Sequence, residues 1–322
     1  MSLLGFGRTQ IPFDMFDLER SAGEARRSEK LASLYHRGQA LAWDGRQVLD
    51  ELVGKHGGIR LGGRERQALQ RVFAMILWGE LAAWKISAQL ADRLEPLEAK
   101  LAATSQAHDE ARHFYVMVDY LRMLGYAPSP IDRPARAVLD LVLETDDVAK
   151  KLVGMQLQIE TLALTIFQAV RESNVEPVLC DLLRYYEKDE ARHVGLGIQY
   201  LPSLVRRMSP ARALSMLSFQ LRIIGLVMWE LKALEPDLEV LGLDARKILF
   251  LGKAKQLGAY EALWAQAGGP PPQRDYVSHV IDGVGEWMFA TRENRGSLRR
   301  RLAAALRIAR TGRAVEPEAI AA

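Results

Sequence analysis

The sequence contains almost no cysteine. Cys180 is the one cysteine among 322 residues, and it lies in the apolar run "EPVLCDLL". A lone thiol cannot form an intramolecular disulfide, a Cys-x-x-Cys redox pair or a cysteine-ligated iron site. The sequence therefore excludes a disulfide-stabilised scaffold and indicates a reduced, intracellular setting.

Targeting and membrane signals are also lacking. The N-terminal stretch "MSLLGFGRTQIPFDMFDLER" has no charged segment followed by an apolar core, so we expect no signal peptide. The most apolar long window, 213–234, is interrupted by Arg222 and Glu230 and falls short of a clean run of about 20 apolar residues. The net charge of +3 is too small to suggest a nucleic-acid partner. These features predict a cytoplasmic protein that binds no nucleic acid.

Signals for β-strands are scarce as well. There is no sustained alternation of apolar and polar residues, whereas apolar residues recur every three or four positions, as in helices. The predicted helices are 17–42, 44–56, 64–94, 97–124, 132–172 with a break near 147, 176–200, 210–234, 243–267, 275–290 and 296–311. We expect an all-α protein whose helices end at Gly- and Pro-rich segments such as "GYAPSPIDRP", "EPD" and "GGPPP".

The sequence does contain an internal duplication. The pentapeptide Asp-Glu-Ala-Arg-His occurs twice, each time about 30 residues after a lone glutamate on an apolar stretch. Glu80 precedes Glu110 by 30 residues, and Glu160 precedes Glu190 by 30, with a Glu-Pro turn about half way in both cases. A helix rises about 1.5 Å per residue, so outgoing and returning helices of similar length place the two glutamates of a pair at one height. The spacing therefore predicts two antiparallel helical hairpins.

The duplication gathers charged side chains on otherwise apolar helices. Glu and His of each pentapeptide are three residues apart and share one helix face. Two hairpins side by side would bring together four carboxylates, which repel strongly at low dielectric, and two imidazoles. Two divalent cations would neutralise the carboxylates. One copy alone would be better explained as an exposed, salt-bridged face, but two copies in the same register favour a metal site.

Residues 64–200 resemble the ferritin-like di-iron carboxylate superfamily, in which two helices each supply a Glu and two others each supply Glu-x-x-His. The Asp-Glu-x-Arg-His form is most similar to the branch of bacterial multicomponent monooxygenase hydroxylases and soluble acyl-carrier-protein desaturases. The resemblance implies a ferritin-like four-helix bundle with additional N- and C-terminal helices. The metal ligands that it implies are Glu80, Glu110, His113, Glu160, Glu190 and His193.

The resemblance also implies roles for the other charged residues of the duplication. Asp109 would orient His193, and Asp189 would orient His113. A metal-bound imidazole usually donates its other N–H to such a carboxylate. The residues that would hold the two aspartates are Arg112 and Arg192.

Several members of the superfamily fit less well. Ribonucleotide reductase small subunits carry a tyrosine four residues after the first ligand histidine, where this sequence has Met117. Rubrerythrins need a cysteine-ligated iron, and arylamine N-oxygenases need a third ligand histidine; His108, two residues before Glu110, should point away. Ferritins and aldehyde-deformylating oxygenases lack the long segment that follows the bundle here. The resemblance therefore favours an O₂-activating oxidase, hydroxylase or desaturase.

Such an enzyme would hold two Fe ions, or a Mn/Fe pair, and take O₂ as co-substrate. An external protein would supply its electrons, because the sequence has no flavin or iron–sulfur motif. Residues one helical turn from the ligands should line a substrate pocket, although such residues also suit ordinary core packing. The predicted pocket residues are Ala83, Trp84, Ala107, Ala163, Leu164 and Gly197. They suit an organic small-molecule or carrier-bound substrate with an apolar portion.

The C-terminal segment 295–313 has seven arginines and no acid. As an amphipathic helix it could bind an acidic carrier protein or an anionic membrane surface, or simply face solvent.

We expect three parts in the chain: a helical segment at 1–63, the bundle at 64–200 and a helical extension with a basic tail at 201–322. We expect the protein to be a monomer or homodimer. The alternative function is a non-catalytic ferroxidase or iron store, and a weaker one is a di-iron hydroxylase of modified tRNA.

Overall fold

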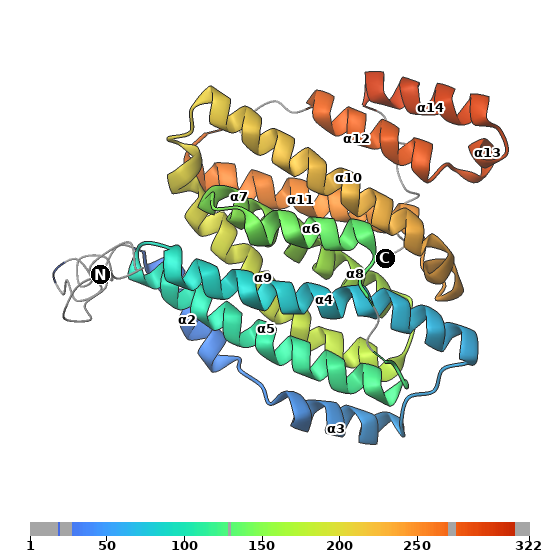
Figure 1. The fold of residues 1–322 in the computed structure, drawn as a ribbon, viewed down its shortest axis with the longest axis horizontal. Coiled ribbons are helices and arrows are strands. Elements are labelled where there is room, and N and C mark those ends of the chain that lie inside the picture. The colour runs from blue at the N-terminus through green and yellow to red at the C-terminus, as the bar shows by residue number, and fades with distance from the viewer. Residues whose placement is uncertain (1–18, 20–27, 128–129, 270–274, 313–322) are drawn as a thin grey trace, which may run out of the picture.

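The computed structural model describes residues 19, 28–127, 130–269 and 275–312, and these fold into a stack of long helices (Figure 1). No strand occurs among these described residues. This confirms the predicted all-α class. The start of the predicted helix 17–42 lies outside the described residues, and so does residue 313 at the end of the basic segment.

Four helices form the central bundle: α4 (Gly63–Arg93), α5 (Leu97–Met123), α8 (Glu160–Glu172) and α9 (Pro177–Val205). Helices α4 and α5 pack as one hairpin, and α8 and α9 pack as the other. Short proline-containing connections separate the helices of each pair, since Pro96 lies just before α5 and Pro177 begins α9. The carboxylate of Glu176 caps α9 by accepting hydrogen bonds from the N–H groups of Val178 and Leu179.

A more irregular segment joins the two hairpins. It consists of α6 (Arg133–Glu144), α7 (Val148–Leu152) and a π-helical stretch, η1 (Val153–Ile159), that leads directly into α8. The predicted break near 147 is confirmed, because Asp147 caps α7 by accepting from the N–H groups of Ala149 and Lys150. The sequence pattern did not predict the π-helix. It lies immediately before Glu160, and single π-turns inside α-helices are frequent at functional sites.

A close approach between η1 and α9 requires glycine at position 197. A Cβ atom added to Gly197 would lie 2.6 Å from the Cβ of Gln156, well inside van der Waals contact. This position is therefore part of the packing between the two segments.

The bundle is covered on both sides. Helices α2 (Glu29–Ala40) and α3 (Gly45–His56) pack against α5 and α9. On the opposite side α10 (Pro210–Val240) packs on α4 and α6, and α11 (Ala245–Ala267) packs on α8 and α9 (Figure 1). Segments before and after the bundle share its apolar core, in which buried Leu49, Phe73 and Leu231 belong to one cluster.

The last described helices form a hairpin at the edge of the molecule (Figure 1). It comprises α12 (Asp275–Met288), the short α13 (Arg292–Arg295) and α14 (Leu298–Thr311). Ion pairs join α12 to α11: Arg246 contacts Glu286 at 2.7 Å, and Lys253 contacts Asp282.

Helix α10 differs from its prediction. We expected it to end at 234, before "EPD", but it continues through Pro236 to Val240. Pro236 lies near the C-terminal end, where it removes a hydrogen bond but does not prevent the last turn, and Leu234 and Leu238 are buried on either side of it. Burial of these two leucines stabilises the extra turn.

Helix α10 is also the one helix in the described ranges that is long and apolar enough to cross a membrane. In this fold 39% of its most apolar window is buried inside the protein. A single helix of this kind is weak evidence for a membrane protein, since core helices of soluble proteins share these properties.

Candidate metal centre

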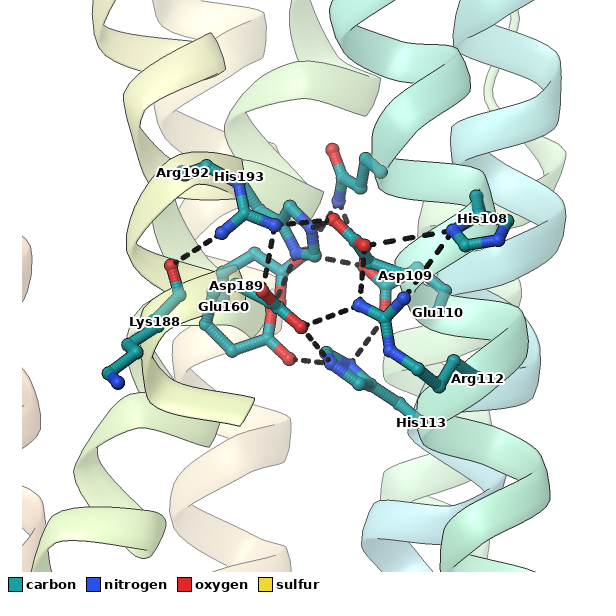
Figure 2. Close-up of polar contacts among 12 residues, drawn as sticks. His108, Asp109, Glu110, Arg112, His113, Glu160, Lys188, Asp189, Arg192 and His193 are labelled. Atoms are coloured by element: carbon teal, nitrogen blue, oxygen red, sulfur yellow. Dashed lines mark hydrogen bonds and ion pairs between the residues drawn. The ribbon is translucent and has the colours of Figure 1, made fainter. Parts of the chain in front are cut away.

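The six predicted ligand residues meet in the middle of the bundle. Each of the four bundle helices contributes to the cluster, and the six side chains are all buried, with exposed fractions of 5% or less. Figure 2 shows His113 and His193 projecting inward from facing helices, with carboxylates between them. The duplicated spacing thus corresponds to one shared height in the bundle.

The first half of the cluster surrounds His113. Its Nδ1 lies 3.1 Å from Oε1 of Glu190, 3.4 Å from Oε2 of Glu80 and 3.6 Å from Oε2 of Glu110. One atom from each of these four side chains falls within a sphere suitable for a single metal ion.

The second half repeats this arrangement around His193. Its Nδ1 lies 2.6 Å from Oε2 of Glu190, 3.1 Å from Oε1 of Glu110 and 3.6 Å from Oε1 of Glu160. Glu110 and Glu190 belong to both halves, whereas Glu80 and Glu160 belong to one each. The geometry therefore suits two ions with two shared carboxylates between them.

The two aspartates of the duplication lie behind the imidazoles. Nε2 of His113 lies 3.1 Å from Oδ2 of Asp189, and Nε2 of His193 lies 3.4 Å from Oδ2 of Asp109. Each aspartate thus contacts the histidine of the other hairpin, as the resemblance implied. The contact leaves both Nδ1 atoms facing the carboxylates.

Two arginines hold these aspartates in place (Figure 2). Nη2 of Arg112 donates to Oδ1 of Asp109 at 2.6 Å and to Oδ2 of Asp189 at 2.8 Å. Nη2 of Arg192 donates to Oδ2 of Asp109 at 2.8 Å and to Oδ1 of Asp189 at 2.7 Å. The resemblance implied that the two arginines would hold these aspartates.

The cluster needs positive charge. Burial raises the pKa of Glu80 and Glu160 well above the usual value for glutamate. Burial acts in the same direction on Glu110 and Glu190, but the neighbouring imidazoles outweigh it and hold their pKa values below the usual value. The carboxylates in turn raise the pKa of both histidines despite their burial. Either protons or bound cations must therefore balance the four carboxylates.

The donor set fits two divalent cations. Oε2 of Glu110 and Nδ1 of His113 are buried and have no hydrogen-bond partner among the described residues, an arrangement that costs free energy unless another group binds there. Four carboxylates carry the charge that two divalent ions neutralise. Carboxylates and imidazoles together are ligands that suit iron and manganese.

No protein-family model matches the chain, and no curated protein matches it. Solved structures, in contrast, superpose on the chain. "Protein 19 with aldehyde deformylating oxidase activity from Synechococcus" superposes with a TM-score of 0.55 at 20% identity, over 64% of this chain and 94% of that one. A variant of an R2-like ligand-binding oxidase with an aerobically reconstituted Mn/Fe cofactor superposes with a TM-score of 0.55 at 16% identity, over 73% and 94%. The chain has the ferritin-like fold.

Two aromatic residues outside the repeated Asp-Glu-Ala-Arg-His motif also contact the site. Trp43, between α2 and α3, donates from Nε1 to Oδ2 of Asp189 at 2.9 Å, and the guanidinium of Arg112 lies 4.7 Å from the centre of its indole ring. The hydroxyl of Tyr186 donates to the main-chain oxygen of His113, and the two rings stack at 4.1 Å. Tyr186 lies three residues before Asp189, so helix periodicity could have placed it at the site. No local signal points to Trp43.

A pair of glutamines adjoins the carboxylates. Nε2 of Gln106 donates to Oε1 of Glu110 at 3.0 Å and to Oε1 of Glu160 at 2.7 Å. Gln156, on the π-helix, donates to Oε1 of Gln106 at 2.7 Å. Each glutamine precedes a predicted ligand by four residues, Glu110 and Glu160 respectively, and therefore lies one helical turn from it.

An apolar cavity adjoins the cluster, with Glu80 and Glu160 in its wall. Its volume is about 90 Å³, enough for several water-sized groups. Of the six predicted pocket residues, Ala83 and Ala163 line this cavity. The predicted residues that do not line it are Trp84, Ala107, Leu164 and Gly197. Gly197 instead packs against Gln156, and the other three are half-buried elsewhere on the bundle.

Proposed function

We propose that this protein is a di-metal oxidase or oxygenase that uses O₂ to oxidise an organic substrate with an apolar portion. The observation that carries the proposal is the apolar cavity that ends at Glu80 and Glu160, one from each half of the cluster. An iron store does not need such a cavity beside its metal-binding residues.

Each residue of the cluster would have a distinct part in holding two Fe ions, or one Mn and one Fe. Glu110 and Glu190 would help to hold both ions, because both belong to the two halves of the cluster. The terminal ligands would be Glu80 and His113 on one ion and Glu160 and His193 on the other. Bound metals would supply the reduction of O₂ and the oxidising power for attack on a C–H bond.

The surrounding residues prepare this site. Asp109 and Asp189 would keep the proton of each imidazole on Nε2, so that the Nδ1 lone pair faces the centre. Gln106 orients the carboxylate of Glu160 through its amide N–H. The apolar wall around Ala83 and Ala163 would exclude water from the substrate.

The solved structures support the choice of metals and reaction class. One of them has aldehyde-deformylating oxidase activity, and another is an R2-like ligand-binding oxidase with a Mn/Fe cofactor. We propose an oxidation of this general class here, with hydroxylation and desaturation as its specific forms. We also propose a cytoplasmic monomer or homodimer that receives electrons from a separate protein.

Anaerobic titration of the apoprotein with ferrous iron, followed by exposure to O₂, tests the proposal. We expect about two irons to be bound and oxidised per chain, because the cluster offers two positions. The double variant Glu110→Ala/Glu190→Ala should lose this uptake, while Glu172→Ala, an exposed substitution on α8, should keep it.

Continued oxidation far beyond two irons per chain, in a closed shell of many subunits, would instead establish an iron store. Absence of uptake by the unaltered protein would overturn the metal-binding proposal itself.

A further inference from the structure

A third buried carboxylate lies on the apolar cavity, and it is not part of the metal cluster. Glu230 belongs to α10 and is 4% exposed. It lines the same cavity as Glu80 and Glu160, yet neither of its oxygens makes a hydrogen bond of ordinary geometry with a described residue, and the N–H of Ala135 interacts with it only weakly. Burial of an unpaired carboxylate is unfavourable unless the group takes up a proton or another molecule binds it, so Glu230 is a candidate ligand-binding group.

The groups around Glu230 do not compensate for its burial. Burial, followed by the charge of Asp132, raises its pKa above the usual value, and the N–H of Ala135 and the charge of Arg71 offset this only in part. The guanidinium of Arg71 already pairs with Asp237 at 3.0 Å and with Asp132 at 3.4 Å. Arg71 is thus already paired with two other carboxylates, and Glu230 makes no ion pair with a described residue.

Glu230 also marks the boundary between two hollows. Together with Met75 it lines both the apolar cavity and a neighbouring polar pocket. Exposed Gln67 and Arg71 form part of that outer pocket. A molecule that moves from the surface to the metal cluster by this route would pass Glu230.

We propose that Glu230 binds the amino group of a substrate whose apolar portion extends through the cavity toward Glu80 and Glu160. The unpaired carboxylate of Glu230 favours an ammonium group over a second carboxylate, and the apolar wall favours an alkyl or similar body. The amino group would then lie away from the metals, and a carbon of the apolar portion would lie beside them. This inference specifies the substrate class of the proposed oxidase and rests on that proposal for its catalytic meaning.

Binding of n-hexylamine, n-hexanol and hexanoic acid to the metal-free protein, measured by calorimetry, tests the inference without any turnover. The amine should bind the unaltered protein most tightly. Glu230→Gln should weaken amine binding by about tenfold to a hundredfold, the range for losing a hydrogen bond to a charged group, and should leave hexanol binding nearly unchanged. Glu239→Gln, a substitution of a 59% exposed side chain on the same helix, is the matched control and should bind all three like the unaltered protein.

Thermal unfolding of each variant shows whether it is folded. A further variant, Val227→Phe, fills the cavity from α10 and should abolish binding of both the amine and the alcohol. Equal or tighter binding of hexanoic acid, or unchanged amine binding in Glu230→Gln, would overturn the inference. Failure of the iron titration with retained amine binding would leave the pocket in place and remove only the oxidase proposal.

Discussion

At the scale of single residues, the site is a set of charges whose partners come from other helices. Asp189 alone contacts Trp43, Arg112, Arg192 and His113. Its four contacts fix the carboxylate, and the carboxylate in turn fixes the orientation of the imidazole. A change in any one partner should therefore affect the ring that faces the metals.

The indole of Trp43 provides a test of this network. Trp43→Phe keeps an aromatic ring but removes the N–H that donates to Asp189, so the metal-free protein should lose about 1.5–3 kcal/mol of unfolding free energy. Urea unfolding measures this loss. Trp229→Phe, at a 58% exposed position on α10, should change stability by less than about 0.5 kcal/mol. Equal effects of the two substitutions would show that the hydrogen bond to Asp189 contributes nothing.

At the scale of helices, the attachment of α3 to α9 depends on charge. Asp181 of α9 accepts from Nζ of Lys55 at 2.7 Å and contacts Nε2 of His56 at 2.9 Å. The hydrogen bond from Lys55, followed by that from His56, lowers the pKa of Asp181 to about 2. Since the folded-state pKa is below the unfolded value of 3.8, the contribution to stability is complete above about pH 4 and is lost as the pH falls toward 2.

The predicted consequence is a pH-dependent effect of Asp181→Asn. Near neutral pH the substitution should lower unfolding free energy by about 0.5–1 kcal/mol, because solvent screens this pair. The difference from the unaltered protein should shrink between about pH 4 and pH 2. Denaturant unfolding over this pH range measures it, and Asp119→Asn provides the same charge change without a contact to α3. A difference that grows on acidification would contradict the assigned role.

At the scale of the whole molecule, the α12–α14 hairpin presents basic and apolar groups at one edge. Leu298, Leu302 and Leu306 of α14 are 69%, 50% and 50% exposed, and Arg299 and Arg300 are exposed beside them. We propose this face as the docking surface for an acidic carrier protein, with an anionic membrane surface as the competing outcome.

Substitution of the two outward arginines tests the docking proposal. Arg299→Gln/Arg300→Gln should weaken binding of an acidic acyl carrier protein, measured by calorimetry, and the effect should diminish at high salt. Arg301 is unsuitable for this test, because it packs over the ring of Trp287 and donates to its main-chain oxygen. Arg136→Gln on α6 is a matched control. Binding to anionic vesicles without binding to the carrier would establish the membrane alternative.

The helices and the metal cluster could be predicted from the sequence because both depend on regular spacing. Helix periodicity holds over most of the chain, and the equal separations of Glu80 from Glu110 and of Glu160 from Glu190 place these residues at one height. The physical cost of gathering four carboxylates then indicated cations. The pairing of the two hairpins into one bundle, by contrast, came from the resemblance to the ferritin-like superfamily.

Other features depended on contacts between segments far apart in the sequence. Trp43 reaches Asp189 from 146 residues away, and the π-helix before Glu160 packs against Gly197. In the sequence Glu230 only interrupts an apolar window, whereas in the folded chain it lies unpaired on the cavity that leads to the metal cluster. Periodicity determines which face of a helix is apolar, but packing determines which neighbour covers that face, and therefore which buried charges are left for a ligand.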